Sequence, residues 1–125
     1  MKKVAQDLLN FIATCTSPYH TVATSQKLLE GNGFVELKQT DTWHLAPGGK
    51  YFTKVYDSTL LAFRVGAKDS TGLKLAAAHT DFPCFRIKPQ AGILTEGYGT
   101  LNVEGYGGMI VSTWLDRPLS MAGKL

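Results

Sequence analysis

The stretch Leu73-Lys74-Leu75-Ala76-Ala77-Ala78-His79-Thr80-Asp81 decides the fold class. The residues before His79 are mostly small or apolar, which is typical of a short strand buried on both faces of a sheet. Residues two apart in an extended chain point to the same side, so His79 and Asp81 are expected side by side. Because α/β sheets bind ligands at the carboxyl ends of their strands, the stretch predicts an α/β fold with a candidate site there.

Two interpretations of this His–Asp pair stay open from the residues alone. In one, His79 ligates a metal such as Zn²⁺ and the Asp81 carboxylate fixes the ring and its tautomer. In the other, the pair only ends the strand and neighbouring polar groups satisfy His79. The sequence has no His-Glu-x-x-His pattern and no two adjacent acidic residues, so it offers no obvious set of further ligands.

The other chemically capable residues have structural interpretations. His20 lies in the first turn of an expected helix and helps to cap it. His44 follows Trp43 in an expected short strand. Asp116 and Arg117 follow a tryptophan and are interpreted as an ion pair beside it, which contributes little to stability when exposed.

Helical signals dominate the first thirty residues or so. Residues 2–14 place apolar side chains at helical spacing, which predicts an amphipathic helix. Ser17 followed by Pro18 predicts a second helix that runs to about Glu30, with Ser17 as the N-cap residue. Gly31-Asn32-Gly33 then supplies residues that tolerate positive φ, as a helix C-terminus requires.

Strands and turns are expected from residue 34 onward. Short strands are predicted at 34–37 and 43–45. A β-hairpin is predicted from 51–56 and 59–65, since both segments are rich in β-branched and aromatic residues and Asp57-Ser58 separates them. A polar turn is expected at 67–72.

The segment after Pro83 changes in character. Phe85 to Pro89 alternates apolar and basic residues, which predicts a half-exposed strand. The tetrapeptide Glu-Gly-Tyr-Gly occurs at 96–99 and again at 104–107, and two similar turns at strand ends explain it better than a repeat architecture does. None of the glycines matches the sequence pattern of a phosphate-binding loop.

Length and composition exclude several classes of protein. The chain has 125 residues, 44% apolar and 18% charged, which is typical of one globular domain and not of a disordered chain. The net charge of +3 comes from scattered residues, so no nucleic-acid partner is expected. The apolar runs are far shorter than the roughly 18 residues of a membrane span, so no membrane partner is expected either.

Two features favour a cytoplasmic location. Cys15 and Cys84 are too few for a disulfide scaffold or a four-cysteine zinc site, and are expected as reduced, buried or half-buried thiols. The N-terminal segment resembles a lipoprotein signal only superficially, because Gln6, Asp7 and Asn10 interrupt its apolar run.

Taken in order along the chain, the motifs resemble the N-terminal part of the aspartyl aminopeptidase family of zinc metallopeptidases. The resemblance covers essentially the whole chain, and one departure is Phe82, where the family usually has a small Ser; a Phe there would narrow the pocket. The matching segments are Ser17–His20, Gly33-Phe34 with Trp43, Gly48–Phe52, Ala78–Asp81 with Pro83, Arg86–Pro89, Val103–Gly108, Thr113–Arg117 and Leu119–Gly123.

The resemblance implies the architecture. Residues 1–90 would form the N-terminal part of an α/β catalytic domain, with two helices and then a mixed β-sheet. Residues 91–125 would form the start of an inserted β-rich dimerisation domain. Family members are several times longer than this chain and build large assemblies, so a homo-oligomer is expected.

The resemblance also implies the chemistry. His79 matches a zinc ligand and Asp81 matches the acidic residue that supports the site, whereas Asp116 matches no ligand. Two Zn²⁺ ions per active site would polarise the scissile carbonyl and lower the pKa of a bound water, and a downstream glutamate would act as general base. The substrate would be a peptide with an N-terminal Asp or Glu.

Two hypotheses follow for the chain itself. The first is that it is an incomplete N-terminal piece of such an enzyme and inactive alone, because its ligand set is incomplete and it stops abruptly at Leu125. The alternative is a non-catalytic, self-associating module derived from the peptidase fold, since uncovered strand edges and apolar faces favour pairing.

Overall fold

A computed structural model of the chain describes residues 2–67 and 71–124. The chain divides into two compact units, which are described separately. The first runs up to Asp81 and also includes the residues from Met121 on, and the second is Phe82–Ser120. Within the described residues, no helix is long and apolar enough to cross a membrane.

Two helices begin the first unit, as the sequence predicts. Helix α1 is Lys3–Thr14 and helix α2 is Pro18–Gly31. Ser17 has an extended backbone, and its hydroxyl accepts a hydrogen bond from the backbone N–H of His20 at 3.4 Å. This side-chain cap satisfies one of the free N–H groups at the start of α2.

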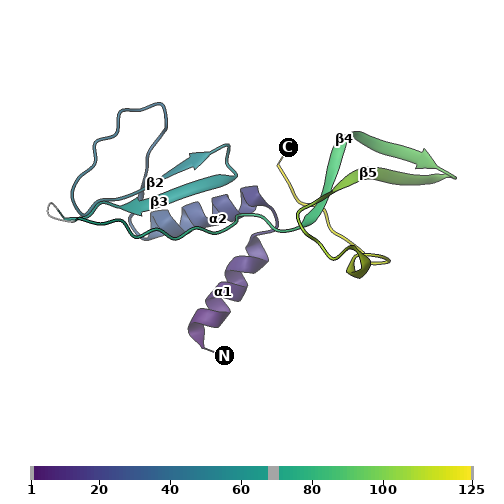
Figure 1. Ribbon diagram of the computed structural model, residues 1–125, viewed down its shortest axis with the longest axis horizontal. Coiled ribbons are helices and arrows are strands. Elements are labelled where there is room, and N and C mark those ends of the chain that lie inside the picture. The colour runs from purple at the N-terminus through teal and green to yellow at the C-terminus, as the bar shows by residue number, and fades with distance from the viewer. Residues whose placement is uncertain (1, 68–70, 125) are drawn as a thin grey trace. The chain divides into compact units, whose positions relative to one another are not determined.

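A three-stranded mixed sheet follows the helices, as expected from the resemblance. Strand β1 (Val35–Glu36) is parallel to β2 (Lys50–Val55), and β3 (Thr59–Arg64) is antiparallel to β2. Helix α2 lies alongside the sheet (Figure 1). The small core includes Val22 of α2 and Phe52 of β2, each at most 2% exposed.

The hairpin between β2 and β3 turns at Tyr56 and Asp57. Both residues have positive φ, 51° and 55°, and the N–H of Ser58 donates to the carbonyl of Val55 at 3.2 Å. Both central residues have the positive φ that type I′ turns require, and three residues separate the paired Val55 and Thr59. The predicted hairpin is therefore confirmed, with its turn centred one residue earlier than the predicted Asp57-Ser58.

The buried strand expected at residues 73–78 is not present in the described part of the chain. Leu73 and Leu75 are 87% and 78% exposed, and residues 71–79 have no regular secondary structure there. The prediction is wrong because a strand buried on both faces requires neighbouring strands, and the described sheet, in the order β1-β2-β3, does not include this segment. Of the expected turn at 67–72, residues 68–70 lie outside the described residues.

The strand expected at residues 43–45 is also wrong, since this segment lies in a loop. Trp43 instead donates its indole N–H to the carbonyl of Lys38 at 2.8 Å, and its ring stacks on Phe63 of β3 with centroids 6.4 Å apart. The aromatic residue that suggested a strand thus covers part of the sheet from the loop.

The second unit is built on a long antiparallel hairpin. Strand β4 is Cys84–Thr95 and β5 is Tyr98–Tyr106, with an irregularity between Ile87 and Gly92. A short 3₁₀ helix, η1 (Val111–Thr113), precedes Trp114, whose ring meets Phe85 edge-on at 5.4 Å. The strand predicted from Phe85 is confirmed as part of β4, but its apolar and basic residues do not alternate in burial, since Arg86–Pro89 are all exposed.

The two Glu-Gly-Tyr-Gly segments play different roles. The first supplies the turn of the hairpin, where Glu96 and Gly97 both have positive φ. The second lies mostly within β5, so the expectation of two similar turns is half wrong. The expected domain boundary between residues 90 and 91 falls inside β4, whereas the compact units divide at Asp81. The assignment of these segments to a catalytic and an inserted domain stays a prediction.

Candidate functional site

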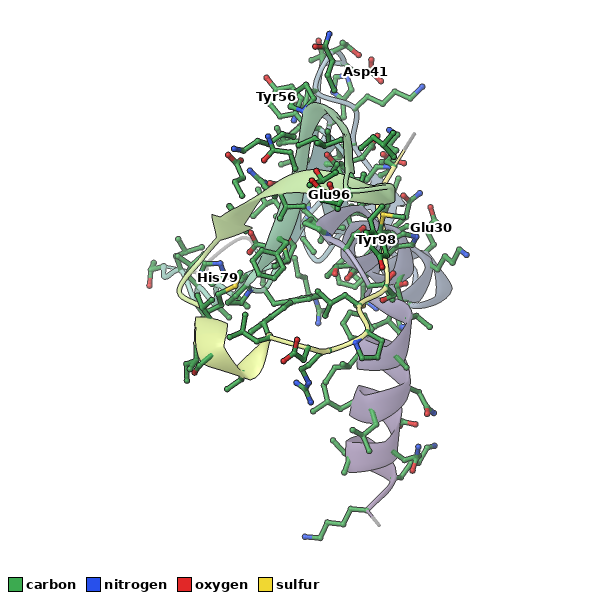
Figure 2. All side chains as sticks on the ribbon, turned by 90° about the vertical axis from the view of Figure 1, so that its right-hand side faces the viewer. Glu30, Asp41, Tyr56, His79, Glu96 and Tyr98 are labelled. Atoms are coloured by element: carbon green, nitrogen blue, oxygen red, sulfur yellow. The ribbon has the colours of Figure 1, made fainter. Side chains whose placement is uncertain are left out.

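The side chains of His79 and Asp81 lie together, as their spacing predicts. The imidazole Nδ1 lies 3.1 Å from a carboxylate oxygen of Asp81. The histidine side chain is 91% exposed and that of the aspartate only 22%. His79 is labelled in Figure 2. The carboxylate is therefore the partly buried member of the pair, and the imidazole is the accessible one.

This arrangement suits one ligand of a metal site. With Nδ1 donating to the Asp81 carboxylate, the other ring nitrogen of His79, Nε2, carries the free lone pair. Metal-binding histidines commonly have this second partner, which fixes the ring and raises its basicity. The residues present thus fit the zinc ligand and supporting acid that the resemblance implies, although these two roles stay predictions.

The described residues do not supply a complete metal site. They contain no group of three or more His, Cys, Asp or Glu side chains that could hold a metal ion. Structural zinc sites have four protein ligands and catalytic zinc sites have three. The pair at residues 79 and 81 can therefore contribute to a metal centre but cannot form one.

The residue between the pair, Thr80, was not predicted to matter. Its hydroxyl donates a part-buried hydrogen bond of 2.8 Å to the carbonyl of Ser58, just after the β2–β3 turn. The two residues are 22 positions apart in the sequence. No sequence signal links them, because every residue has a backbone carbonyl that can accept such a bond.

The other sequence candidates are structural where the structure describes them. The Nδ1 of His20 lies 2.7 Å from the hydroxyl of Ser17, so this histidine takes part in the helix cap as expected. His44 lies exposed in the loop before β2. The ion pair expected between Asp116 and Arg117 does not occur among the interactions of the described residues, and Asp116 has a φ of 54°.

Lys54 of β2 links three elements of the first unit. Its ammonium group lies 3.2 Å from a carboxylate oxygen of Glu36 in β1 and 2.7 Å from the amide oxygen of Gln26 in α2. The side chain is 22% exposed, so these contacts are partly shielded from water. They hold the sheet and the helix together below the β2–β3 turn.

An exposed ion pair lies on the turn itself. The ammonium group of Lys124 is 2.6 Å from a carboxylate oxygen of Asp57. The hydrogen bond and the charge of Lys124 lower the pKa of Asp57, and the same two effects of Asp57 raise the pKa of Lys124. Within the first unit, the turn therefore binds both the segment at Thr80 and the segment that follows Met121.

The chain contains two cysteine thiols. Cys15 and Cys84 are free and half-buried, as the sequence predicts. Phe82, which follows the His–Asp pair directly in the chain, is 52% exposed.

Comparisons with known proteins agree on one group of enzymes. A family model described as aminopeptidase I zinc metalloprotease (M18) matches residues 11–125. The probable M18 family aminopeptidase 2 of Clostridium acetobutylicum is 47% identical over 124 residues. That match covers 97% of this chain and 29% of the Clostridium protein, so the chain spans less than a third of the length of this curated relative.

Solved structures give the same result. Chaetomium thermophilum mApe1 matches with a TM-score of 0.82 and 38% identity, over 90% of this chain and 26% of that one. The mApe1 dodecamer of S. cerevisiae matches with a TM-score of 0.73 and 27% identity, over 92% of this chain and 28% of that one.

Proposed function

Since the chain belongs to the M18 family of aminopeptidase I zinc metalloproteases, we propose that it forms part of a zinc-dependent aminopeptidase that removes Asp or Glu from peptide N-termini. The observation that carries this proposal is the contact between His79 Nδ1 and Asp81 at 3.1 Å, with the imidazole exposed. The peptidase function rests on the family, and the acidic preference rests on the motifs that resemble aspartyl aminopeptidases.

The two residues would have distinct tasks. His79 would bind zinc through Nε2, and Asp81 would hold the ring in one tautomer and one orientation. Zinc bound there, two ions per active site by resemblance, would supply Lewis-acid polarisation of the scissile carbonyl and a bound water of lowered pKa. The further ligands and the general base would come from residues outside this chain.

The test uses the protein at its natural length and aminoacyl substrates that begin with Asp, Glu or Leu. We expect hydrolysis of the Asp and Glu substrates, loss of activity with a chelator, and recovery with added zinc. His79→Ala should abolish the activity, and His44→Ala, a histidine in the loop before β2, is the matched control. Full activity in the presence of chelator, or in His79→Ala, would contradict the proposal.

The acidic preference has its own test at Phe82. If this side chain narrows the substrate pocket, Phe82→Ser should change the ratio of kcat/KM between the Asp and Leu substrates. An unchanged ratio of kcat/KM would show that Phe82 does not determine specificity, and it would not contradict the proposed peptidase activity.

The 125-residue chain by itself is proposed to be inactive. The support is that its described residues contain no group of three metal-binding side chains. Release of N-terminal Asp or Glu by the purified chain, in proportion to its concentration, would contradict this part of the proposal.

The protein is also proposed to act as a homo-oligomer, and to do so in the cytoplasm. One structural relative is a dodecamer. The β4–β5 hairpin exposes apolar side chains, among them Leu94 and Tyr98 at 79% and 74%, which association would cover. The location is supported by the free thiols of Cys15 and Cys84. A monomer in light scattering would contradict the first statement.

The same apolar surface favours the alternative, a self-associating module without catalysis. The two functions differ in what the natural-length protein does with an acidic aminoacyl substrate. Association without zinc binding or hydrolysis would favour the module.

A further inference from the structure

We propose that Thr80 is a positioning residue, whose hydrogen bond to the Ser58 carbonyl holds His79 and Asp81 in the orientation that binds metal. This inference rests on the proposed function, because it concerns how the zinc ligand is presented. It adds to that function a residue that contacts neither metal nor substrate.

The first step is that the chain spans 29% of the length of its curated relative, and within its described residues no strand lies beside the segment that precedes the pair. Among the described residues, 71–79 form no helix or strand and take part in no backbone–backbone hydrogen bond. A catalytic ligand needs a fixed approach, because misplacement by about 1 Å can cost about 100-fold in rate.

The second step is that Thr80 provides a fixed point within the tripeptide. Its hydroxyl donates to the Ser58 carbonyl at 2.8 Å, within the normal range for such a bond. The side chains of the residues on either side, His79 and Asp81, bond to each other instead. The tripeptide is therefore attached to the hairpin through its middle residue, and the side chains of the outer two residues form the pair.

The third step is that the acceptor belongs to a well-held part of the fold. Ser58 follows the turn of the β2–β3 hairpin, and its own N–H donates to Val55. Strand β2 contains Phe52, which is fully buried, and Lys54, which is bonded to Glu36 and Gln26. The sheet thus fixes the position of the Ser58 carbonyl. The hydrogen bond from Thr80 then fixes the position of the tripeptide, and with it His79 and Asp81, relative to the sheet.

The experiment measures zinc affinity by competition with a chromogenic chelator, on the natural-length protein. Thr80→Val keeps the shape of the side chain and removes the hydroxyl, so zinc should bind about 10-fold or more weakly, as for loss of other groups that orient ligands. Thr80→Ser keeps the hydroxyl and should restore the affinity. The matched control is Thr113→Val, because the Thr113 hydroxyl also donates to a backbone carbonyl at 2.8 Å, but in the second unit.

His79→Ala separates the failure of this inference from the failure of the proposed function. Unchanged zinc affinity in His79→Ala would contradict the proposed function. Weakened binding in His79→Ala together with wild-type affinity in Thr80→Val would overturn only the role of Thr80. Thr80→Ala, which adds no bulk, is measured in parallel, so that wild-type affinity in either folded variant overturns the inference.

Discussion

The ring of Tyr51 closes over the backbone of Gly49. A Cβ placed on Gly49 would lie 2.5–2.7 Å from three atoms of the Tyr51 side chain, closer than real side chains approach. The ring cannot move aside freely, because its hydroxyl accepts the N–H of Ala46 at 3.0 Å and its face packs on Phe63 with centroids 5.8 Å apart. The glycine therefore allows the loop before β2 to close against the sheet.

We predict from this contact that Gly49→Ala destabilises the protein by about 1–3 kcal/mol, the usual range for overpacking. The measurement is the free energy of unfolding in denaturant. Gly31→Ala is the control, because nothing lies within 4 Å of a Cβ at that position. Equal stability of Gly49→Ala and wild type would contradict close packing of the Tyr51 ring on the Gly49 backbone.

The helix cap gives a second prediction. Ser17 is 6% exposed. Its hydroxyl accepts the backbone N–H of His20 and also lies within hydrogen-bond distance of the His20 ring nitrogen Nδ1. Ser17→Ala should lower the free energy of unfolding by about 1 kcal/mol. Ser25→Ala within the same helix should cost nothing, since Ala is the better helix former. An equal effect of both changes would show that the cap does not stabilise α2.

The strained turn of the β2–β3 hairpin gives a third prediction. Tyr56 has a φ of 51° and a side chain that is 90% exposed, so it incurs the cost of the left-handed region without compensating burial. Tyr56→Asn should raise stability by up to about 1 kcal/mol, because Asn is favoured in type I′ turns. Tyr98→Asn, which replaces another exposed tyrosine next to a hairpin turn, should not. A loss of stability in Tyr56→Asn would contradict the turn conformation.

The ion pair on this turn predicts a pH dependence. The pKa of Asp57 is lowered from 3.8, so its contribution to stability is complete above pH 3.8 and is lost as the pH falls through the lowered value. The pKa of Lys124 is raised from 10.5, so its contribution is complete below pH 10.5 and is lost as the pH rises through the raised value. Both groups are exposed, so the effect should be small and should weaken with salt.

The measurement is an NMR titration of the Asp57 carboxyl carbon. In Lys124→Gln its pKa should return toward 3.8, the ordinary value. Lys27→Gln is the control, since this lysine lies on α2 and is not among the groups that shift Asp57. An unchanged titration curve in Lys124→Gln would show that the pair does not form in solution.

Local signals allowed much of the first unit to be predicted. Two of these signals are local: the capping pattern at Ser17 and Pro18, and the β-branched segments on either side of the turn at Asp57. The residues that form each element lie within a few positions of one another, so the sequence alone predicts the helix start and the hairpin. The mixed sheet and the family followed from motifs at matching positions, and both are confirmed.

The predictions that failed concern segments whose structure depends on residues far away in the sequence. The residues before His79 look like a buried strand, but a strand forms only beside another, and the described sheet does not include this segment. Trp43 has high strand propensity, yet its indole N–H is satisfied by a loop carbonyl. The hydrogen bond from Thr80 to Ser58 could not be predicted either, because it depends on how the hairpin is placed against the segment.

The role of His79 as a zinc ligand is tested most directly by the zinc content of the natural-length protein, measured by elemental analysis after removal of loosely bound metal. We predict that the wild-type protein and His44→Ala retain the same stoichiometric zinc, and that His79→Ala, shown to be folded by circular dichroism, loses zinc. Full zinc content in His79→Ala would contradict the claim that this histidine is a ligand of a peptidase metal centre.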